Sequence, residues 1–362
     1  MKVLACSQAQ AQERLGITVA PDRASVPALA RRLRESGVGS ACITGMQADD
    51  GRALAWLETD HACGWLASAQ RADGSWQPFS GHLAAAIAEG FVVADAAVLA
   101  MMATHHADTL PLLSWGEQPP APTAQSKPAR RLDLYAIVDS AERVNQVLAA
   151  GLKTLQLRSK KPEQSGPQWL DQLRDEVQRS VTACESAGAE LFINDHWQIA
   201  VEAGARGVHL GQEDLLALGD AGRATLQATG MALGISSHSL WELCRARALA
   251  PRYIACGPVW PTLTKAMPWQ PQGLDNLAWW CRMALTPVVA IGGILGAEQV
   301  FESARCGADG ICIVRGLGER PETVVPRLQA ALEAGRKAMA ADAIPVAGPH
   351  PSLLRNAGRT GR

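Results

Sequence analysis

The sequence has little charge, few aromatic residues and no paired cysteines. Charged residues make up 19% of its 362 positions and the formal net charge is −1, so it lacks the overall positive field that attracts nucleic acid. Its nine cysteines include no Cys-x-x-Cys pair, which argues against a zinc site or a disulfide framework. These absences favour a cytoplasmic protein with reduced thiols and no nucleic-acid partner.

Long uninterrupted hydrophobic runs are also missing. The N-terminus MKVLACSQAQ continues into polar residues and contains no apolar signal core. The most apolar stretch, residues 82–103, is interrupted by Glu89 and Asp95, so we expect a buried helix rather than a membrane span. The sequence therefore predicts a cytoplasmic protein that does not contact a membrane.

The chain does contain enough apolar residues, 48% of the total, to form two domains. Residues 109–131 are rich in proline, alanine and polar residues, a composition typical of a linker. This linker would separate a small domain at 1–108 from a larger one at 132–341. A second stretch rich in proline and glycine, residues 342–362, predicts a disordered tail.

Eight short apolar runs alternate with amphipathic segments in the larger domain. Each run is almost continuously apolar, which is typical of parallel strands that are covered on both faces. The runs are LDLYAIVD from Leu132, TLQLRSK from Thr154, LFIND from Leu191, GVHLGQ from Gly207, MALGIS from Met231, YIACGPV from Tyr253, PVVAIGGI from Pro287 and GICIVRG from Gly310. Eight strands alternating with helices over about 200 residues predict a C-terminal (β/α)8 TIM barrel.

Polar residues and glycines follow the apolar runs. In such a barrel the carboxyl ends of all strands face one mouth, where active sites are found. The candidate residues are Gln156, Arg158, Lys160, Asn194, Asp195, Asp214, Ser236, Thr262, Thr264, Lys265, Gly293, Val314 and Arg315. The expected mouth therefore combines cationic groups, carboxylates and two glycine-containing loops.

Two of these residues are carboxylates at neighbouring strand ends. Asp195 and Asp214 have no histidine or cysteine at matching spacing, and this suits Mg²⁺, which takes one or two carboxylates. The simpler alternative is that Asp195 only caps the following helix. Arg158 and Lys160 alternate along one strand end, where they would bind a diphosphate unless they are only solvated surface charges.

The last loops of the barrel carry a second signal. Lys265 ends the turn PTLTK, which adds two hydroxyl groups to its charge. The segments AIGGI and IVRGL follow the seventh and eighth strands, the usual phosphate-binding place in these barrels. We therefore expect a diphosphate with Mg²⁺ beside a monophosphate, and group transfer between two phosphorylated small molecules.

Seven motifs in order make a family resemblance specific. The sequence contains QLRSK, IND, GVHLGQED, GISSH, GPVWPTLTK, AIGGI and GADGICIV, and from about Leu132 to Gly335 it resembles the thiamine-phosphate synthases. The resemblance implies that 4-amino-2-methyl-5-hydroxymethylpyrimidine diphosphate condenses with a thiazole ethyl phosphate or its carboxy form. The products would be thiamine phosphate and pyrophosphate, with Mg²⁺ as cofactor.

The same resemblance implies a role for each candidate residue. The pyrimidine diphosphate would be held by Gln156, Arg158, Lys160, Asn194 and Lys265, and its pyrimidine ring would contact Ser236. Mg²⁺ would be bound by Asp195 and Asp214. The thiazole phosphate would be bound by Gly293, Val314 and Arg315, and Thr262 and Thr264 would contact this phosphate or the thiazole carboxylate. Arg158, Lys160 and Lys265 would be the catalytic cations. Arg315 stands where the family usually has serine, so we expect phosphate binding that is retained but altered.

The first 108 residues resemble a different family of the same pathway. The segment PFSGHLAAAI is similar to the start of the closing helix in ribokinase-like pyrimidine kinases. Pro78 and Ser80 replace glycines of that motif, and Gly81 replaces its catalytic Asp or Cys. The resemblance implies a small α/β domain, a truncated and inactive kinase-like fold, unless the alanine-rich helix matches by chance.

Three other functions remain open. The first is a thiazole tautomerase or regulator of the related barrel type, which uses a histidine; His238 is present, but such relatives lack the full metal and diphosphate set found here. The second is a non-catalytic role for the whole chain, with the N-terminal domain recruiting a pathway partner. A homo-oligomer formed through the N-terminal domain is a separate expectation. The third is a bifunctional kinase–synthase, which Gly81 disfavours.

Overall fold

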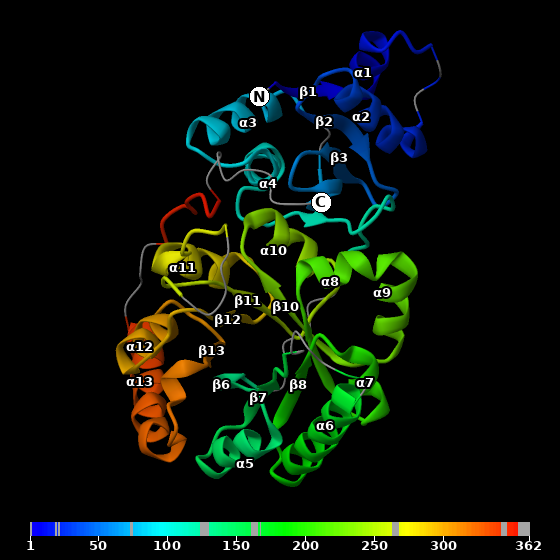
Figure 1. Cartoon of the computed structure of the whole chain (residues 1–362). Helices are drawn as coiled ribbons and strands as arrows, with labels where there is room; N and C mark the ends of the chain where they lie inside the picture. The colour runs from blue at the N-terminus through cyan, green and yellow to red at the C-terminus, as the bar shows by residue number, and fades with distance from the viewer. Residues whose placement is uncertain are drawn as a thin grey trace.

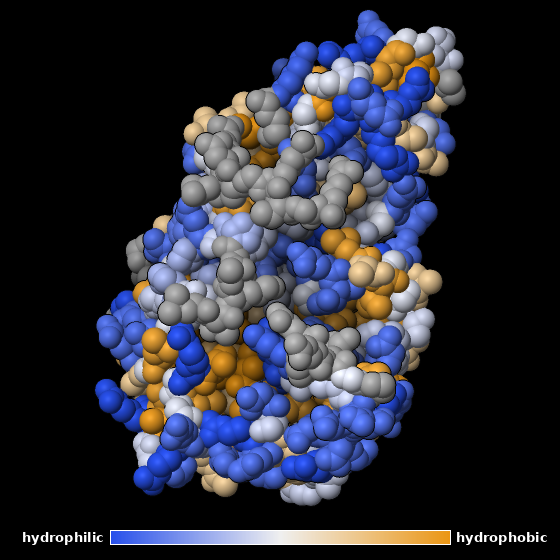
Figure 2. Space-filling view, in the orientation of Figure 1, coloured by the Kyte–Doolittle hydropathy of each residue, from blue (hydrophilic) through white to orange (hydrophobic). Residues whose placement is uncertain are grey.

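The computed structural model describes residues 2–18, 20, 22–72, 75–123, 130–160, 166, 168–262, 268–341 and 346–353. An N-terminal α/β domain and a barrel lie against one another along the long axis of the molecule (Figure 1). Most of the visible surface of both is hydrophilic, and hydrophobic residues reach it mainly on the lower part of the barrel in this view (Figure 2). No helix in the described part of the chain is long and apolar enough to cross a membrane.

The N-terminal domain is a five-stranded sheet between two layers of helices. Its strands, in hydrogen-bonded order, are β1 (Val3–Ser7), β2 (Ser40–Gln47), β3 (Arg52–Glu58), β4 (Cys63–Arg71) and β5 (Leu112–Leu113). Only β1 and β2 are parallel. The helices are α1 (Gln8–Arg14), η1 (Arg23–Ser25), α2 (Val26–Glu35), α3 (Phe79–Ala88) and α4 (Val93–His105). This arrangement confirms the predicted α/β character of the domain.

Alternation along the strands explains the two helical layers. On β3, Leu54 and Trp56 pack with α1 and α2, whereas Ala55 and Leu57 belong to the core that includes α3 and α4. Successive side chains of a strand point to opposite faces, so a strand that is apolar at every position needs cover on both sides. The second of these cores continues without a break into the barrel.

The predicted linker begins too early in the sequence. Strand β5 pairs with Leu66 and Ala67 of β4, and Leu110, Leu112 and Leu113 are buried. The N-terminal fold therefore extends beyond residue 108, because the apolar LPLL segment completes its sheet.

The eight strands predicted for the barrel are confirmed. They are β6 (Asp133–Val138), β7 (Thr154–Leu157), β8 (Glu190–Asn194), β9 (Gly207–Leu210), β10 (Ala232–Ser237), β11 (Tyr253–Cys256), β12 (Val288–Ala290) and β13 (Gly310–Ile313). All neighbouring strands are parallel, and pairing of β13 with β6 and of β10 with β9 closes the barrel. This is the TIM-barrel architecture expected from the alternating pattern.

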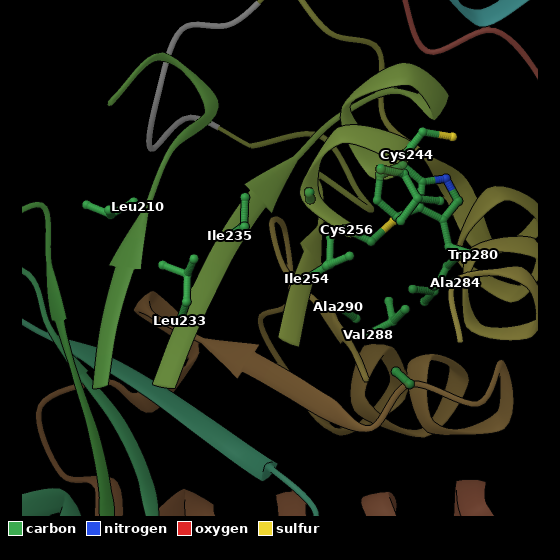
Figure 3. Close-up of a cluster of buried hydrophobic side chains, with 14 of the residues drawn as sticks. Leu210, Leu233, Ile235, Cys244, Ile254, Cys256, Trp280, Ala284, Val288 and Ala290 are labelled. Atoms are coloured by element: carbon green, nitrogen blue, oxygen red, sulfur yellow. The ribbon is translucent and has the colours of Figure 1, made fainter. Parts of the chain in front are cut away.

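Helices surround the barrel on its outside. They are α5 (Ala141–Ala149), α6 (Gln168–Ser186), α7 (Trp197–Glu202), α8 (Gln212–Ala217), α9 (Gly219–Ala228), α10 (Leu240–Arg247), α11 (Gly273–Met283), α12 (Ala297–Arg305), η2 (Arg315–Leu317) and α13 (Pro321–Ala341). Serine starts two of them: the hydroxyls of Ser140 and Ser239 accept hydrogen bonds from backbone N–H groups in the first turns of α5 and α10. Figure 3 shows apolar side chains of β10, β11 and β12 gathered with Cys244 and Trp280 in the layer between strands and helices.

Part of the predicted disordered tail is ordered. Residues 346–353 pack on the barrel, where Leu353 forms a bridge with Trp269 and the backbone N–H of Gln270 donates to Ser352 at 2.9 Å. Leu353 is only 4% exposed, so its burial offsets the entropy of ordering a stretch rich in proline and glycine. Residues 342–345 and 354–362 lie outside the described residues.

Candidate active site

The structure brings the candidate residues to one end of the barrel. Gln156 lies in β7, Arg158 and Lys160 follow it, Asn194 ends β8, Asp195 comes next, Asp214 lies in the first turn of α8, Ser236 lies in β10, Thr262 follows β11, Gly293 follows β12, and Val314 and Arg315 follow β13. Because the strands are parallel, these are all carboxyl ends and face the same mouth. Thr264 and Lys265 lie outside the described residues.

Asp195 has an unusual backbone conformation. Its φ is +65°, in the left-handed region that few residues other than glycine adopt, although aspartate and asparagine tolerate it. Its N–H donates to the carbonyl of His209 on β9 at 3.0 Å, which ties the end of β8 to the neighbouring strand. The alternative that Asp195 caps the next helix is wrong, because the N-cap of α7 is His196 and no side chain caps that helix in the described structure.

The electrostatics of Asp195 place it beside other candidate residues. Burial raises the pKa of its carboxyl group, and the charge of Asp214 raises it further. The charges of His196 and Arg158 act in the opposite direction, as does a hydrogen bond with Asn194. Asp195, Asp214 and Arg158 are therefore close enough to influence one another at the mouth of the barrel.

The two carboxylates fit a hard divalent cation. Asp214 accepts a hydrogen bond from the Gly211 N–H at 3.0 Å through Oδ2, and its side chain is exposed. Within the described ranges, neither Asp195 nor Asp214 forms an ion pair, and the charges of His196 and Arg158 only partly offset the repulsion between the two carboxylates, because the pKa of Asp195 remains raised. Two carboxylates and no soft ligands are a donor set suited to Mg²⁺ with water or phosphate oxygens completing its shell.

A chain of hydrogen bonds crosses the inside of the barrel. Gln156 Nε2 donates to the Tyr135 hydroxyl at 3.0 Å, and this hydroxyl lies 2.6 Å from that of Tyr253. His209 Nδ1 lies 2.7 Å from the Tyr253 hydroxyl, and its Nε2 lies 2.8 Å from Ser236 Oγ. Five strands contribute to this chain, which ends at a candidate substrate-binding residue.

The polarity of this chain follows from its members. The Gln156 amide N–H can only donate, and each tyrosine hydroxyl carries a single proton. If every proton is used once, Tyr253 donates to Nδ1 of His209, and Nε2–H of the neutral ring donates to Ser236. The Ser236 hydroxyl proton is then directed away from His209 and is available to a ligand in the mouth.

His209 should make the folded state sensitive to acid. Burial lowers the pKa of its ring to about 3, with further contributions from the charges of Arg158 and His238. In the unfolded chain a histidine pKa is about 6.5, so the unfolded state takes up a proton that the folded state excludes. The stability contributed by the neutral ring is complete above pH 6.5 and is lost as the pH falls toward 3.

Denaturant unfolding of the wild type and of His209→Asn between pH 7.5 and pH 4.5 would measure this effect. The wild type should lose stability more steeply than the variant over this range, because the other titrating groups are common to both. Parallel pH dependences would contradict the assignment.

The loops after β11 and β12 pack tightly against each other. Gly292 and Gly293 have φ angles of +93° and +72°, and a Cβ atom on them would lie 2.6 Å from Pro258 Cβ and 2.5 Å from Trp260 Cβ. Only glycine satisfies both the backbone conformation and the contact. The AIGGI loop is thus held close to the loop that carries Thr262.

The cationic candidates differ in exposure. Arg158 is half-buried and its backbone N–H donates to Val138 at 2.7 Å, whereas Lys160 and Arg315 are exposed. Arg158 is therefore the least exposed of these three cationic residues. The roles of all three, and the effect of Arg315 on phosphate binding, stay predictions.

The sequence-based prediction missed the interior of the barrel. Tyr135, His209 and Tyr253 were read only as parts of apolar runs or motifs, yet their side chains form the hydrogen-bonded chain. A polar atom inside an apolar strand was the available signal, because a buried hydroxyl or ring nitrogen needs a partner.

Comparison with known proteins agrees with this geometry. The model of the family described as thiamine monophosphate synthase matches residues 134–317, which is half of the chain and nearly all of the barrel. The chain belongs to this family. Its barrel is therefore a transferase domain of thiamine biosynthesis.

Individual relatives cover the same region. The thiamine-phosphate synthase of Rhizobium etli is 44% identical over 195 residues, 53% of this chain and 90% of that protein. The enzyme of the same description from Neisseria meningitidis is 45% identical over 204 residues, 55% of this chain and 94% of that protein. A solved thiamine phosphate pyrophosphorylase from Pyrococcus furiosus is 26% identical with a TM-score of 0.48, over 56% of this chain and 96% of that one. The family match begins at the first barrel strand and leaves out the N-terminal domain.

Proposed function

We propose that this thiamine monophosphate synthase family member joins hydroxymethylpyrimidine diphosphate to a thiazole phosphate and releases pyrophosphate. The observation that carries the proposal is the grouping of Asp195, Asp214 and Arg158 in one electrostatic environment at the strand ends. A pair of carboxylates at the mouth of the barrel beside a guanidinium suits a metal-bound diphosphate. The tight glycine loop after β12 offers backbone N–H groups for the second phosphate.

In this reaction the bond from the pyrimidine methylene carbon to the diphosphate oxygen breaks, and both electrons leave with pyrophosphate. The lone pair of the thiazole nitrogen then forms the new carbon–nitrogen bond. Arg158 and Lys160 would neutralise charge on the departing group, and Lys265 is proposed to act with them. The chemistry needs no strong base, and the neutral, buried His209 ring suits a positioning role for Ser236.

Asp195 and Asp214 are the residues proposed to hold Mg²⁺. When bound, the ion would supply positive charge to the leaving diphosphate. Asn194 and Gln156 lie beside these residues on neighbouring strands and would orient the pyrimidine diphosphate. The reaction is proposed to occur in the cytoplasm, where the nine free cysteines would stay reduced.

The N-terminal domain is proposed to be a kinase-like remnant without kinase activity. Gly81, at the position of the expected catalytic residue, lies in the first turn of α3 with nothing within 4 Å of where a Cβ atom would be. Pro78 is the N-cap of this helix and provides no side-chain hydrogen bond. This arrangement lacks the acid or thiol that a phosphoryl transfer of that type requires.

One assay tests the proposed reaction directly. The full-length protein is incubated with pyrimidine diphosphate, thiazole phosphate and Mg²⁺, and thiamine phosphate is measured with and without EDTA. We expect product that depends on both substrates and disappears with EDTA. A folded protein that binds thiazole phosphate but forms no product would overturn the proposal in favour of a tautomerase or regulator.

A further inference from the structure

Helix α10 of the barrel is buried along its whole length. All eight of its residues are buried, and they include Arg245 and Arg247, which are 2% and 6% exposed. Barrel helices form an outer ring and usually keep a solvated polar face. Two buried guanidinium groups on such a face indicate that something other than water must satisfy them.

The N-terminal domain provides this cover. Arg247 donates to the carbonyl groups of Leu110 and Pro111 at 2.8 and 3.2 Å, and Arg245 donates to that of Cys63 at 3.1 Å. Helix α4 lies against α10 on the same side (Figure 1). The two domains are therefore docked through specific contacts.

Trp115, which follows β5, also contacts α10. Its Nε1 donates to the Arg245 carbonyl at 2.8 Å, and the guanidinium groups of Arg223 and Arg245 lie 5.4 and 5.5 Å from its ring. Cation–π contacts of this kind are strengthened when they are desolvated. Trp115 therefore adds a hydrogen bond and a cation–π contact to the interface between the N-terminal domain and α10.

A carboxylate of the N-terminal domain caps the start of α10. Asp95 of α4 is 1% exposed, and its Oδ1 accepts a hydrogen bond from the Trp241 N–H at 2.9 Å. The backbone N–H of Leu240 adds to the electrostatic stabilisation of this carboxylate. The first N–H groups of a helix have no partner within it, and a negative charge there is favourable. Burial and the charge of Glu242 raise the pKa of Asp95 to about 7, whereas these N–H groups act in the opposite direction.

The turn that precedes α10 is part of the candidate active site. Glu242, in the first turn of α10, accepts hydrogen bonds from the backbone N–H and from Nδ1 of His238, at 2.6 and 3.0 Å. Gln212 donates to Ser237 Oγ at 3.0 Å. Ser236 directly precedes Ser237 and His238 in the chain, so a shift of the first turn of α10 would move the Ser236 hydroxyl.

We propose that Asp95 of the docked N-terminal domain is a positioning residue for the active site of the barrel. Its carboxylate holds the first turn of α10 in place, and this turn keeps Ser236 in position in the pyrimidine site. The kinetic part of this inference rests on the proposed function. The structural part, that Asp95 orders residues 236–243, does not. The N-terminal domain then contributes to substrate binding without carrying a catalytic group.

The test compares Asp95→Ala, Asp95→Asn and Arg247→Gln in the full chain. Arg247→Gln is the matched control because it weakens the same interface at the other end of α10. Asp95→Ala should raise the KM for pyrimidine diphosphate about tenfold, the effect of losing the hydrogen bond between Ser236 and the substrate, and leave the KM for thiazole phosphate unchanged. Asp95→Asn keeps an acceptor oxygen and should restore most of the affinity.

Hydrogen–deuterium exchange gives a readout that does not depend on activity. Asp95→Ala should speed exchange in residues 236–243, whereas Arg247→Gln should leave that segment protected. If Asp95→Ala leaves this exchange and both KM values as in the wild type, the proposal is overturned. It is also overturned if Arg247→Gln produces the same KM change. If the wild type forms no thiamine phosphate at all, the proposed function fails, and the exchange data still decide whether Asp95 orders the turn.

Discussion

Replacing Asp195 with asparagine should lower the kcat of thiamine phosphate formation by about 100-fold or more, the order expected when a group that stabilises the departing charge is lost. The variant removes one of the two carboxylates that influence each other at the mouth. It should also raise the Mg²⁺ concentration needed for half-maximal activity. Asparagine is the appropriate substitute because it tolerates the φ of +65° at this position, whereas alanine would add backbone strain.

A neighbouring carboxylate supplies the control. Glu213 is exposed in the first turn of α8, beside Asp214, and has no role in the proposed site. Glu213→Gln removes one negative charge from the next strand end, beside Asp214, and should leave kcat and the Mg²⁺ requirement unchanged. An Asp195→Asn enzyme with normal kcat and a normal Mg²⁺ curve would remove Asp195 from the metal site.

Replacing Gly234 with alanine should destabilise the protein by about 3 kcal/mol or more, because overpacking and broken buried hydrogen bonds both contribute. A Cβ atom on Gly234 in β10 would lie 2.3 Å from Cζ and 2.4 Å from the hydroxyl of Tyr253. The ring would have to move, and its hydroxyl would lose Tyr135 and His209 as partners. Denaturant unfolding measures the loss.

Two comparisons separate this effect from the general effect of adding a methyl group. Gly81→Ala in α3 meets nothing within 4 Å and should stabilise the protein by about 0.5–1 kcal/mol, since alanine favours a helix. In a Tyr253→Ala background, Gly234→Ala should cost much less because the ring is gone. An equal cost in both backgrounds would show that the ring contact is not the cause.

The barrel could be predicted strand by strand for a physical reason. Parallel strands covered on both faces must be apolar at nearly every position, so runs such as LFIND and GICIV stand out between amphipathic helices. Parallel alignment then puts every strand's carboxyl end at one mouth. Asn194, Asp195 and Ser236 could be assigned to a common site without knowledge of any distance.

The hydrogen-bonded chain inside the barrel could not be predicted in the same way. Tyr135 and Tyr253 are separated by 118 positions, and only closure of the barrel brings their hydroxyls to 2.6 Å. Successive side chains of a strand point alternately into and out of the barrel, but the sequence does not show which inward-facing residues of different strands lie at the same height along the barrel axis. Register between distant strands decides this.

The boundaries of both domains were also misjudged for a physical reason. Composition alone favoured a linker at 109–131 and a disordered tail at 342–362, since proline-rich segments rarely bury much surface. Leu112 and Leu353 nevertheless find partners on β4 and at Trp269. A few apolar residues are enough to order such a segment when a complementary surface already exists.

Local patterns in the sequence were sufficient to predict the barrel, the order of its strands and a mouth that contains Arg158, Asp195 and Gly293. These follow from local patterns, because burial on both faces and strand-end position are recorded in neighbouring residues. The tertiary structure alone decided that His209 links Tyr253 to Ser236 and that Asp95 caps α10. Both depend on contacts between segments far apart in the chain, whose free energy arises only when the folded elements exclude water from the polar groups between them.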